Sequence, residues 1–317
     1  MRRAVALLAA LSLLAVPGIA RADEALEEYL ERASAADYRG RGVLFSSWGG
    51  MSAGVAYEVV RSAGVSMVRG PDGDLLIGTG TAASRSGTEW RALEIPSASS
   101  WWVSDRYVLS GPQAAVRLGR PAIAYTVLEG DLARVRLVVD ERSAVPLLTE
   151  VLDGDGRVYR LAVLIDFESG ESMDRVAAAD PVSELSGMAG METMAAAPPP
   201  PSLPEQVAGY RRADAYRVSD DTVQVFYTDG LFSFSVFEAP RGATPEAFRA
   251  AATWEVAGER YRRIVTPAHA WIQWHSPNRS YVLVGDLPPD HLAAVLTGLP
   301  EPGDRSWIVR LWRRLFG

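Results

Sequence analysis

Alternating hydrophobic and polar positions dominate this chain from Tyr38 onward, and they predict many short β-strands. The runs are broken by Gly, Pro, Asp and Ser, the residues that favour turns. Strand follows strand without an intervening helical pattern, and this order indicates antiparallel sheets. The strands predicted in the first half of the chain are Gly42–Trp48, Val55–Arg61, Val65–Arg69, Asp74–Gly78, Trp101–Leu109, Ala122–Glu129, Arg134–Asp140, Val145–Leu152 and Arg157–Phe167.

The sharpest pattern is a hairpin between Val223 and Pro240, with Asp229-Gly230 separating two alternating runs. A type I′ turn of two residues needs the positive φ that this dipeptide tolerates. It predicts Thr228 opposite Leu231, with an apolar face made of Val223, Val225, Tyr227, Phe232, Phe234 and Val236. The other face is polar except for Phe226 and Leu231, which we take as candidate partner-binding residues.

The run Arg157–Phe167 follows the turn residues Asp153–Gly156 and is the most regular strand of the first half. Its alternate positions form one apolar face, and the opposite face is mixed. A curved sheet around a helix or an apolar cavity produces such a strand, and so does an ordinary sandwich. The candidate cavity residues on this strand are Leu161, Val163, Ile165 and Phe167, and a closed core is equally consistent with them.

Helical patterns are few. Asp23–Ala33 predicts a short amphipathic helix, and Thr244-Pro245-Glu246 predicts a helix start. A last helix follows strands predicted at Arg260–Val265, Trp271–His275 and Tyr281–Val284, and its apolar face carries Leu292, Val295, Leu296 and Leu299.

A change of composition separates the two β-rich regions. Asp174–Gln206 is rich in Ala, Gly, Met and Ser and ends in Pro198–Pro201, which is typical of a semi-rigid linker. The predicted organisation is a β domain over 23–173, this linker over 174–206, a small α+β domain over 207–300 and a tail over 301–317. The expected fold class is therefore mainly β with an α+β C-terminal part.

The first residues read as a signal peptide over 1–22. Arg2-Arg3 precede an apolar run from Ala4 to Val16, and Ala20-Arg21-Ala22 is a small-x-small cleavage site. We therefore expect an extracytoplasmic protein, in a periplasm or on the outer face of the cytoplasmic membrane.

Charge and cysteine content exclude several classes. Cleavage after Ala22 leaves 29 basic residues against 39 acidic ones, and this negative balance disfavours a nucleic-acid partner. The chain has no cysteine, so a disulfide framework, a thiolate metal site and a cysteine nucleophile are all absent.

The tail after Pro300 has a helical pattern of apolar residues, unlike the β-rich sequence before it. Large apolar residues recur at helical spacing with arginines beside them, which suits a membrane interface and also a helix docked on its own domain. The candidate membrane-contact residues are Trp307, Ile308, Leu311, Trp312, Arg313, Arg314, Leu315 and Phe316.

Several short motifs match signatures of catalytic or ligand sites. Gly50–Gly54 matches the G-x-S-x-G nucleophile elbow at Ser52, and Gly78–Ala83 matches a dinucleotide fingerprint, but strand-like sequence follows both where a helix is required. Met188, Met191 and Met194 could offer thioethers to copper, although their surroundings read as linker. His269, His275 and His291 lack metal-ligand spacing. We expect no catalytic residue, no metal site and no cofactor.

The hairpin also carries a resemblance. Tyr227–Leu231 followed by Phe234–Phe237 resembles the YSDGL…SVF hairpin of RseB/MucB proteins, and Leu203-Pro204 with Gly209-Tyr210 is similar to that family's LPxGY entry. Tyr281–Leu299 also looks like the end of RseB-type proteins. Arg136–Asp140, Ala144–Leu147 and Arg157–Phe167 look like the pattern that RseB shares with the lipoprotein carriers LolA and LolB.

This resemblance implies a half-open antiparallel β-barrel around helices and an apolar cavity in the first domain. It further implies a regulator that binds and protects the extracytoplasmic part of a membrane-bound anti-sigma factor, with a lipid or mislocalised lipoprotein as the releasing signal. The alternative is an extracytoplasmic carrier of lipid or lipoprotein acyl chains, which needs lipid and no protein partner.

Overall fold

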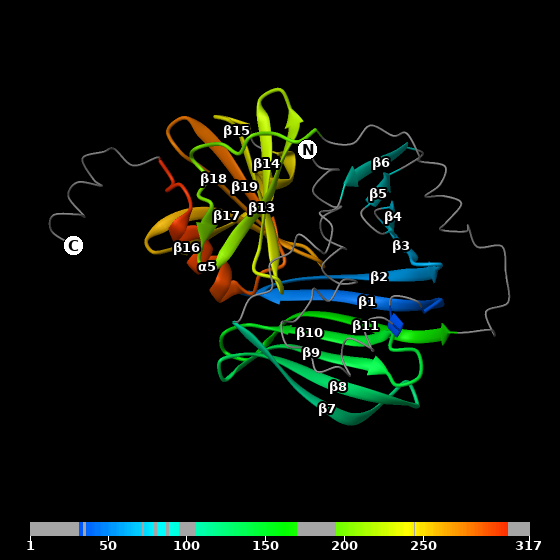
Figure 1. Ribbon diagram of the computed structural model, residues 1–317. Coiled ribbons are helices and arrows are strands. Elements are labelled where there is room, and N and C mark those ends of the chain that lie inside the picture. The colour runs from blue at the N-terminus through cyan, green and yellow to red at the C-terminus, as the bar shows by residue number, and fades with distance from the viewer. Residues whose placement is uncertain are drawn as a thin grey trace.

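A computed structural model describes residues 32–33, 36–71, 73–78, 81–86, 89–94, 106–169, 195–243 and 245–303. They form two antiparallel sheets, one of eleven and one of eight strands (Figure 1). The signal peptide, the Met188–Met194 segment and the amphipathic tail, together with most of the helix expected at Asp23–Ala33, lie outside the described residues.

The eleven-stranded sheet is built from two sequential meanders that meet where β1 pairs with β11. Its order is β6-β5-β4-β3-β2-β1-β11-β10-β9-β8-β7, so β6 and β7 are its edges and the described strands leave it open. The strands are β1 Tyr38–Trp48, β2 Met51–Ser62, β3 Val65–Gly70, β4 Gly73–Gly78, β5 Thr81–Ser86, β6 Glu89–Glu94, β7 Tyr107–Arg117, β8 Arg120–Glu129, β9 Leu132–Asp140, β10 Pro146–Leu152 and β11 Val158–Ser169.

The eight-stranded sheet has the order β12-β13-β14-β15-β19-β18-β17-β16. It too consists of two meanders, joined where β15 pairs with β19. The strands are β12 Gln206–Val207, β13 Tyr210–Ser219, β14 Thr222–Thr228, β15 Ser233–Pro240, β16 Ala252–Val256, β17 Glu259–Val265, β18 Ala270–His275 and β19 Arg279–Gly285.

Two short helices accompany this second sheet. The helix start expected near Pro245 yields only the five-residue 3₁₀ helix η2 (Glu246–Ala250), whereas α5 (Pro289–Gly298) is the predicted C-terminal helix with Leu292, Val295 and Leu296 buried. Of the helices that the described residues form, none is long and apolar enough to span a membrane. The expected mainly β fold, with an open first sheet and an α+β C-terminal part, is confirmed.

The largest hydrophobic core does not belong to one sheet alone. It contains Val225, Phe234 and Leu283 of the eight-stranded sheet and also Val151 and Tyr159 of the eleven-stranded sheet. A second core, with Tyr38 and Leu164, lies within the eleven-stranded sheet. The two sheets are therefore packed against each other through buried apolar side chains.

Candidate functional site

The two sheets meet at one end of the eleven-stranded sheet (Figure 1). Hairpin turns of that sheet face loops of the other sheet and the first turn of α5. We call this contact the inter-sheet joint. Its polar and aromatic residues from the first sheet are Trp48, Arg106, Tyr107, Glu129, Arg134, Tyr159 and Arg160, together with the backbone carbonyl of Gly49. Those from the second are Asp229, Phe232, Trp254, Arg263, Asp286, Asp290 and His291.

Two β-bulges aim side chains of the first sheet at the joint. Val127 pairs with Val135 and Leu128 with Ala133, so Arg134 is the extra residue of β9. In the same way the pairing of β10 and β11 passes over Tyr159. Bulges reorient a side chain relative to the regular alternation of a strand. Both bulged side chains are buried, with 4% and 2% of their surface exposed.

A charged cluster crosses the joint around Glu129, which ends β8. Its carboxylate accepts hydrogen bonds from Arg106 Nε and, at 2.5 Å, from Arg134 Nε, and it lies 2.9 Å from His291 Nε2 of α5. Arg134 also pairs with Asp290 at 2.8 Å. Burial acts to raise the pKa of Glu129, but these hydrogen bonds outweigh it and the pKa is lowered. The cluster thus favours an ionised Glu129 shared between the sheets.

The loop of the predicted hairpin forms the second polar contact. Asp229 is fully buried, and its Oδ1 accepts hydrogen bonds from the backbone N–H of Leu231 and Phe232 at 3.0 and 2.8 Å. Its Oδ2 accepts the Tyr107 hydroxyl of β7 at 2.5 Å, and the rings of Tyr107 and Phe232 meet edge to face. Burial first, and then Asp229, raise the pKa of Tyr107. The hairpin loop therefore docks on the first sheet.

This loop corrects the predicted register. Thr228 pairs with Ser233 and Tyr227 with Phe234, so the loop has four residues and not two. The shift is by two positions, which preserves the side of the sheet on which each strand residue lies. The physical reason is the Asp229 carboxylate, whose bonds to two following N–H groups stabilise a wider loop than a type I′ turn.

Arg160 of β11 bridges the first sheet to two loops of the second. Its Nη1 donates to the carbonyl of Ala268 and its Nη2 to the carbonyl of Asp286, both at 2.5 Å. Beside it, the Ser46 hydroxyl donates to the carbonyl of Pro267 at 2.7 Å. Arg160 has only 2% of its surface exposed and Ser46 none. Backbone carbonyls that belong to the second sheet thus depend on donors of the first.

An aromatic contact completes the joint at the β1–β2 turn. The rings of Trp48 and Trp254 meet edge to face with centroids 4.6 Å apart. The Arg263 guanidinium lies 4.2 Å from the Trp48 ring centroid and donates to the carbonyl of Gly49 at 3.4 Å. Burial lowers the pKa of Arg263. A cation held over an aromatic face in a desolvated place contributes about 2 kcal/mol.

The candidate lipid-cavity residues do not share one face. Arg41 of β1 pairs with Asp166 and Gly42 with Leu164, so Ile165 is the extra residue of a bulge. Ile165 is 55% exposed, whereas Val163 is buried and Phe167 packs with Leu164 in the second core. The expected continuous apolar face is therefore wrong, because the bulge moves Phe167 to the side of Leu164. A lipid-binding role for Leu161, Val163, Ile165 and Phe167 stays a prediction.

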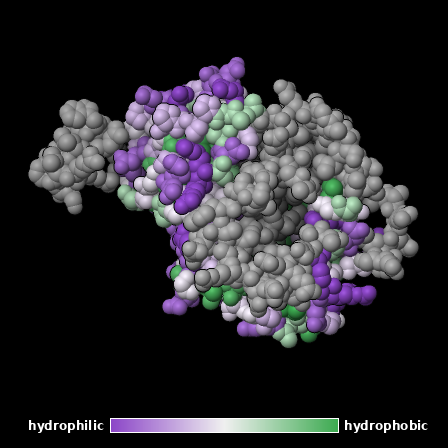
Figure 2. All heavy atoms as spheres, in the orientation of Figure 1, coloured by the Kyte–Doolittle hydropathy of each residue, from purple (hydrophilic) through white to green (hydrophobic). Residues whose placement is uncertain are grey.

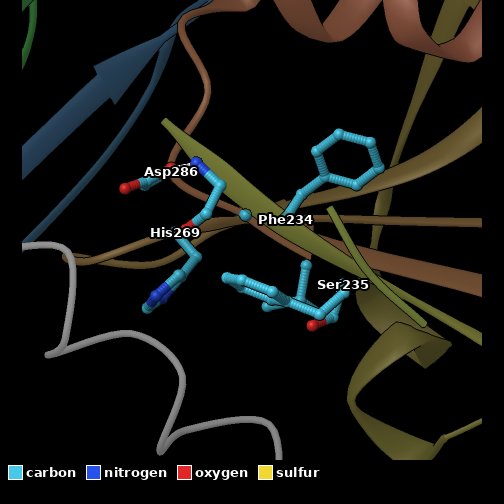
Figure 3. Close-up of a pocket in the computed structure, with 8 residues that line it drawn as sticks. Phe234, Ser235, His269 and Asp286 are labelled. Carbon is cyan, nitrogen blue, oxygen red and sulfur yellow. Dashed lines mark hydrogen bonds between the residues drawn. The ribbon is translucent and has the colours of Figure 1, made fainter. Parts of the chain in front are cut away.

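The candidate partner-binding residues of the hairpin are not on a solvated face. Phe226 is 6% exposed, and Leu231 packs against the largest core. Figure 3 shows a small cavity in this region, lined by Phe226, Phe234, Ser235, His269 and Asp286 among others. Its volume of about 10 Å³ suffices for about one water molecule and not for an acyl chain. The role of Phe226 and Leu231 in partner binding also stays a prediction.

The exposed large hydrophobic side chains of the described residues belong to the other sheet. Among the described residues, the large hydrophobic side chains with at least 37% exposure all belong to the eleven-stranded sheet or its turns: Phe45, Val108, Val116, Leu118, Leu132, Val158 and Ile165. Figure 2 shows hydrophobic patches among hydrophilic residues over both sheets.

The motifs weighed for catalysis fall in β-structure. Ser52 is the second residue of β2 and pairs with Ser47, so a strand follows it where a nucleophile elbow needs a helix. The strand β5 likewise follows Gly78 where a dinucleotide site needs a helix. Of the three histidines, only His291 has its ring in the polar cluster of the joint. The sequence carries no signal for this place of His291, because the hydrogen-bond partners Tyr210 and Glu129 lie more than 80 positions away.

Comparison with known proteins gives matches in structure alone. No family model and no curated protein matches this chain. The crystal structure of MucB in complex with MucA(peri) matches with a TM-score of 0.47 and 18% identity, covering 87% of this chain and 99% of that one. The MucA/MucB complex of Pseudomonas aeruginosa matches with a TM-score of 0.48 and 18% identity, over 87% and 98% of the two chains. The LolA superfamily protein NE2245 of Nitrosomonas europaea matches with a TM-score of 0.21 and 9% identity, over 83% and 95%.

Proposed function

We propose that this chain is an exported negative regulator of an envelope-stress sigma factor. It binds the extracytoplasmic part of a membrane-spanning anti-sigma factor and protects that part from proteolysis. The mature protein acts in a periplasm or at the outer face of the cytoplasmic membrane, and the anti-sigma factor is its protein partner.

One observation carries the proposal: the hairpin whose sequence resembles RseB/MucB proteins is also the hairpin that docks on the first sheet. Within Tyr227–Leu231, Asp229 holds the loop and accepts the Tyr107 hydroxyl across the joint. The residues that carry the resemblance therefore stand at the contact that sets the arrangement of the two sheets. MucB has been solved with MucA, and the partner proposed for this chain is of the corresponding kind.

The chemistry of the joint suits a reversible contact. It combines buried apolar packing with ion pairs, a cation over an aromatic ring and hydrogen bonds to backbone carbonyls. A ligand shifts such a contact only by binding one arrangement more tightly than the other. In this proposal a lipid or lipoprotein is that ligand, and opening of the joint weakens the grip on the anti-sigma factor.

The exposed apolar side chains of the described residues support a contact surface on the eleven-stranded sheet. Among the described residues they lie on the eleven-stranded sheet, with Val116 at 77% and Val108 at 58% on its edge strand β7. Exposed apolar groups that gather on one part of a surface often mark interaction sites. We therefore favour the eleven-stranded sheet over the hairpin face as the surface that partner and lipid reach first.

A pulldown from detergent-solubilised membranes tests the proposal. The mature chain is the bait, and an Asp229→Ala variant is compared with an Asp221→Ala variant, because Asp221 is an exposed residue of the β13–β14 turn. The expected prey is a membrane-spanning protein whose cytoplasmic part binds a sigma factor. It should be recovered equally by wild type and Asp221→Ala and in reduced amount by Asp229→Ala.

The same experiment separates the alternative. A carrier would retain lipids or acylated lipoproteins in stoichiometric amount without any anti-sigma factor. Recovery of such cargo alone would replace the regulator proposal by the carrier function.

A further inference from the structure

His291 occupies an unusual place in the joint. It lies in the first turn of α5 and only 4% of its surface is exposed. Its Nδ1 lies 2.8 Å from the Tyr210 hydroxyl of β13, within its own sheet. Its Nε2 lies 2.9 Å from Glu129 Oε2 and 3.1 Å from Arg106 Nη2, both in the other part of the molecule. One imidazole thus connects the two sides.

The neutral ring satisfies the contacts to Glu129 and Tyr210, whereas Arg106 Nη2 is itself a donor and makes no hydrogen bond with a protonated Nε2. With its proton on Nε2, the ring donates to Glu129, and Nδ1 accepts the hydroxyl proton of Tyr210. Tyr210 is fully buried, and among the described residues His291 is the hydrogen-bond partner of its hydroxyl. A second proton on Nδ1 would turn this acceptor into a donor. The Tyr210 hydroxyl proton would then lose its acceptor, which is costly for a buried group.

Burial and the two nearby arginines also favour the neutral ring, and Glu129 opposes them. The charged and titratable groups that face His291 are Glu129, Arg106, Arg134 and Tyr210, with Asp290 beside it on α5. Burial is the largest cause that lowers the pKa of His291, and the charges of Arg106 and Arg134 lower it further, whereas Glu129 raises it. The net effect is a lowered pKa, so the closed joint favours the neutral ring.

We propose that His291 makes the inter-sheet joint pH-sensitive: the joint is closed when the imidazole is neutral and loosens when acidification of the envelope protonates it. This inference rests on the reversible joint of the proposed function. It adds a regulatory input, the proton, to the lipid or lipoprotein signal.

The difference between the pKa of His291 in the closed joint and in the open joint fixes the direction of the pH effect and its pH window. When the joint opens, the ring meets water and regains its ordinary pKa of about 6.5. Because the closed state has the lower pKa, its stabilisation is complete above that value and is lost as the pH falls below it. If the closed joint excludes the proton entirely, the closing constant falls by about 30-fold between about pH 7.5 and about pH 5.

Thiol labelling of the isolated chain measures this constant. The chain has no cysteine, so Ser46→Cys introduces a single thiol. Ser46 is fully buried at the joint and contacts Pro267, whereas its neighbour Ser47 is exposed. The labelling rate of Ser47→Cys divided by that of Ser46→Cys gives the protection of the joint. The division also cancels the intrinsic pH dependence of the thiol.

The expected result is a protection that falls roughly 10- to 30-fold between about pH 7.5 and about pH 5. Adding His291→Gln should abolish the fall, with His291→Asn as a second neutral side chain. His275→Gln is the matched control and should leave the fall unchanged, because His275 contacts Ser280 away from the joint. A protection independent of pH, or a fall that survives in both His291 variants, would overturn the inference.

His269→Gln distinguishes the other buried histidine, which lies next to Ala268 in a loop held by Arg160. If this variant alone abolishes the fall, the assignment to His291 is wrong. No partner takes part in the labelling assay. A negative labelling result therefore refutes the pH-sensitive joint without affecting the proposed partner, and a negative pulldown refutes the proposed partner without affecting the labelling result.

Discussion

The turn between β1 and β2 allows the energetics of the joint to be tested with two adjacent glycines. Gly49 and Gly50 have φ values of +55° and +78°, so an alanine at either position is strained. That strain costs about 1–2 kcal/mol per residue. A Cβ on Gly49 would also lie 2.7 Å from Arg263 Nη2, whereas a Cβ on Gly50 would meet nothing within 4 Å. The backbone strain is thus about equal in the two variants, and only Gly49→Ala also disturbs the joint.

The excess cost of Gly49→Ala follows from what Arg263 loses. The guanidinium must move away from the new methyl group, and it then gives up its place 4.2 Å from the Trp48 ring and its bond to the Gly49 carbonyl. A desolvated cation–π contact of this kind contributes about 2 kcal/mol. We expect Gly50→Ala to lower the free energy of unfolding by about 1 kcal/mol and Gly49→Ala by about 3 kcal/mol.

Urea denaturation followed by tryptophan fluorescence measures both values. A double-mutant cycle with Arg263→Ala identifies the source of the excess. In the Arg263→Ala background, both glycine variants should cost the same. Equal costs already in the wild-type background, or an excess that persists without Arg263, would refute the assignment of this contact to the joint.

Three further variants test other parts of the joint and the corrected strand. Tyr107→Phe removes a hydrogen bond to a buried carboxylate and should lower the free energy of unfolding by about 2 kcal/mol. Tyr57 of β2 packs against the second core, and Tyr57→Phe is the control, with an expected loss of less than about 0.5 kcal/mol; equal losses would contradict the role of the Tyr107 hydrogen bond. The pKa of Glu129 is lowered in the folded state, so its contribution to stability is complete above the ordinary carboxyl pKa and is lost as the pH falls from there through the lowered pKa. Glu129→Gln should therefore show a smaller drop in urea midpoint than the wild type between about pH 5 and about pH 3. An unchanged drop would exclude Glu129 as a source of acid sensitivity. In β11, Leu164→Ala should lower the free energy of unfolding by about 2–4 kcal/mol and Ile165→Ala by less than about 1 kcal/mol. Strict alternation from Leu161 would bury Ile165 and expose Leu164, and so predicts the opposite order, which thermal unfolding of the two variants tests.

The sequence predicted the β-strands best where alternation was strong. The strands β8 to β11 and β17 to β19 and the helix α5 lie where expected, within a few residues. β5 was missed because Thr81–Ser86 is small and polar and shows no alternation, and β13 and β16 were missed as well. The hairpin strands kept their predicted faces even though their register changed.

The joint could not be predicted, because its contacts connect residues far apart in the sequence. Arg160 reaches Asp286 over 126 positions and Tyr107 reaches Asp229 over 122. One signal was present: the supposed outer face of β11 carries Arg160 and Leu164, a mixture that a solvated face does not need. This mixture indicates a strand that is buried on both sides and contains bulges. Strict alternation instead predicts one apolar face and one solvated face for such a strand.

The proposed regulatory role is tested most directly in cells. The coding sequence is deleted, and transcription is measured from a promoter that depends on the sigma factor bound by the anti-sigma factor from the pulldown. The account predicts that transcription rises without any envelope stress and returns to its basal level when the wild-type chain is restored. Transcription that stays basal after the deletion would contradict the account.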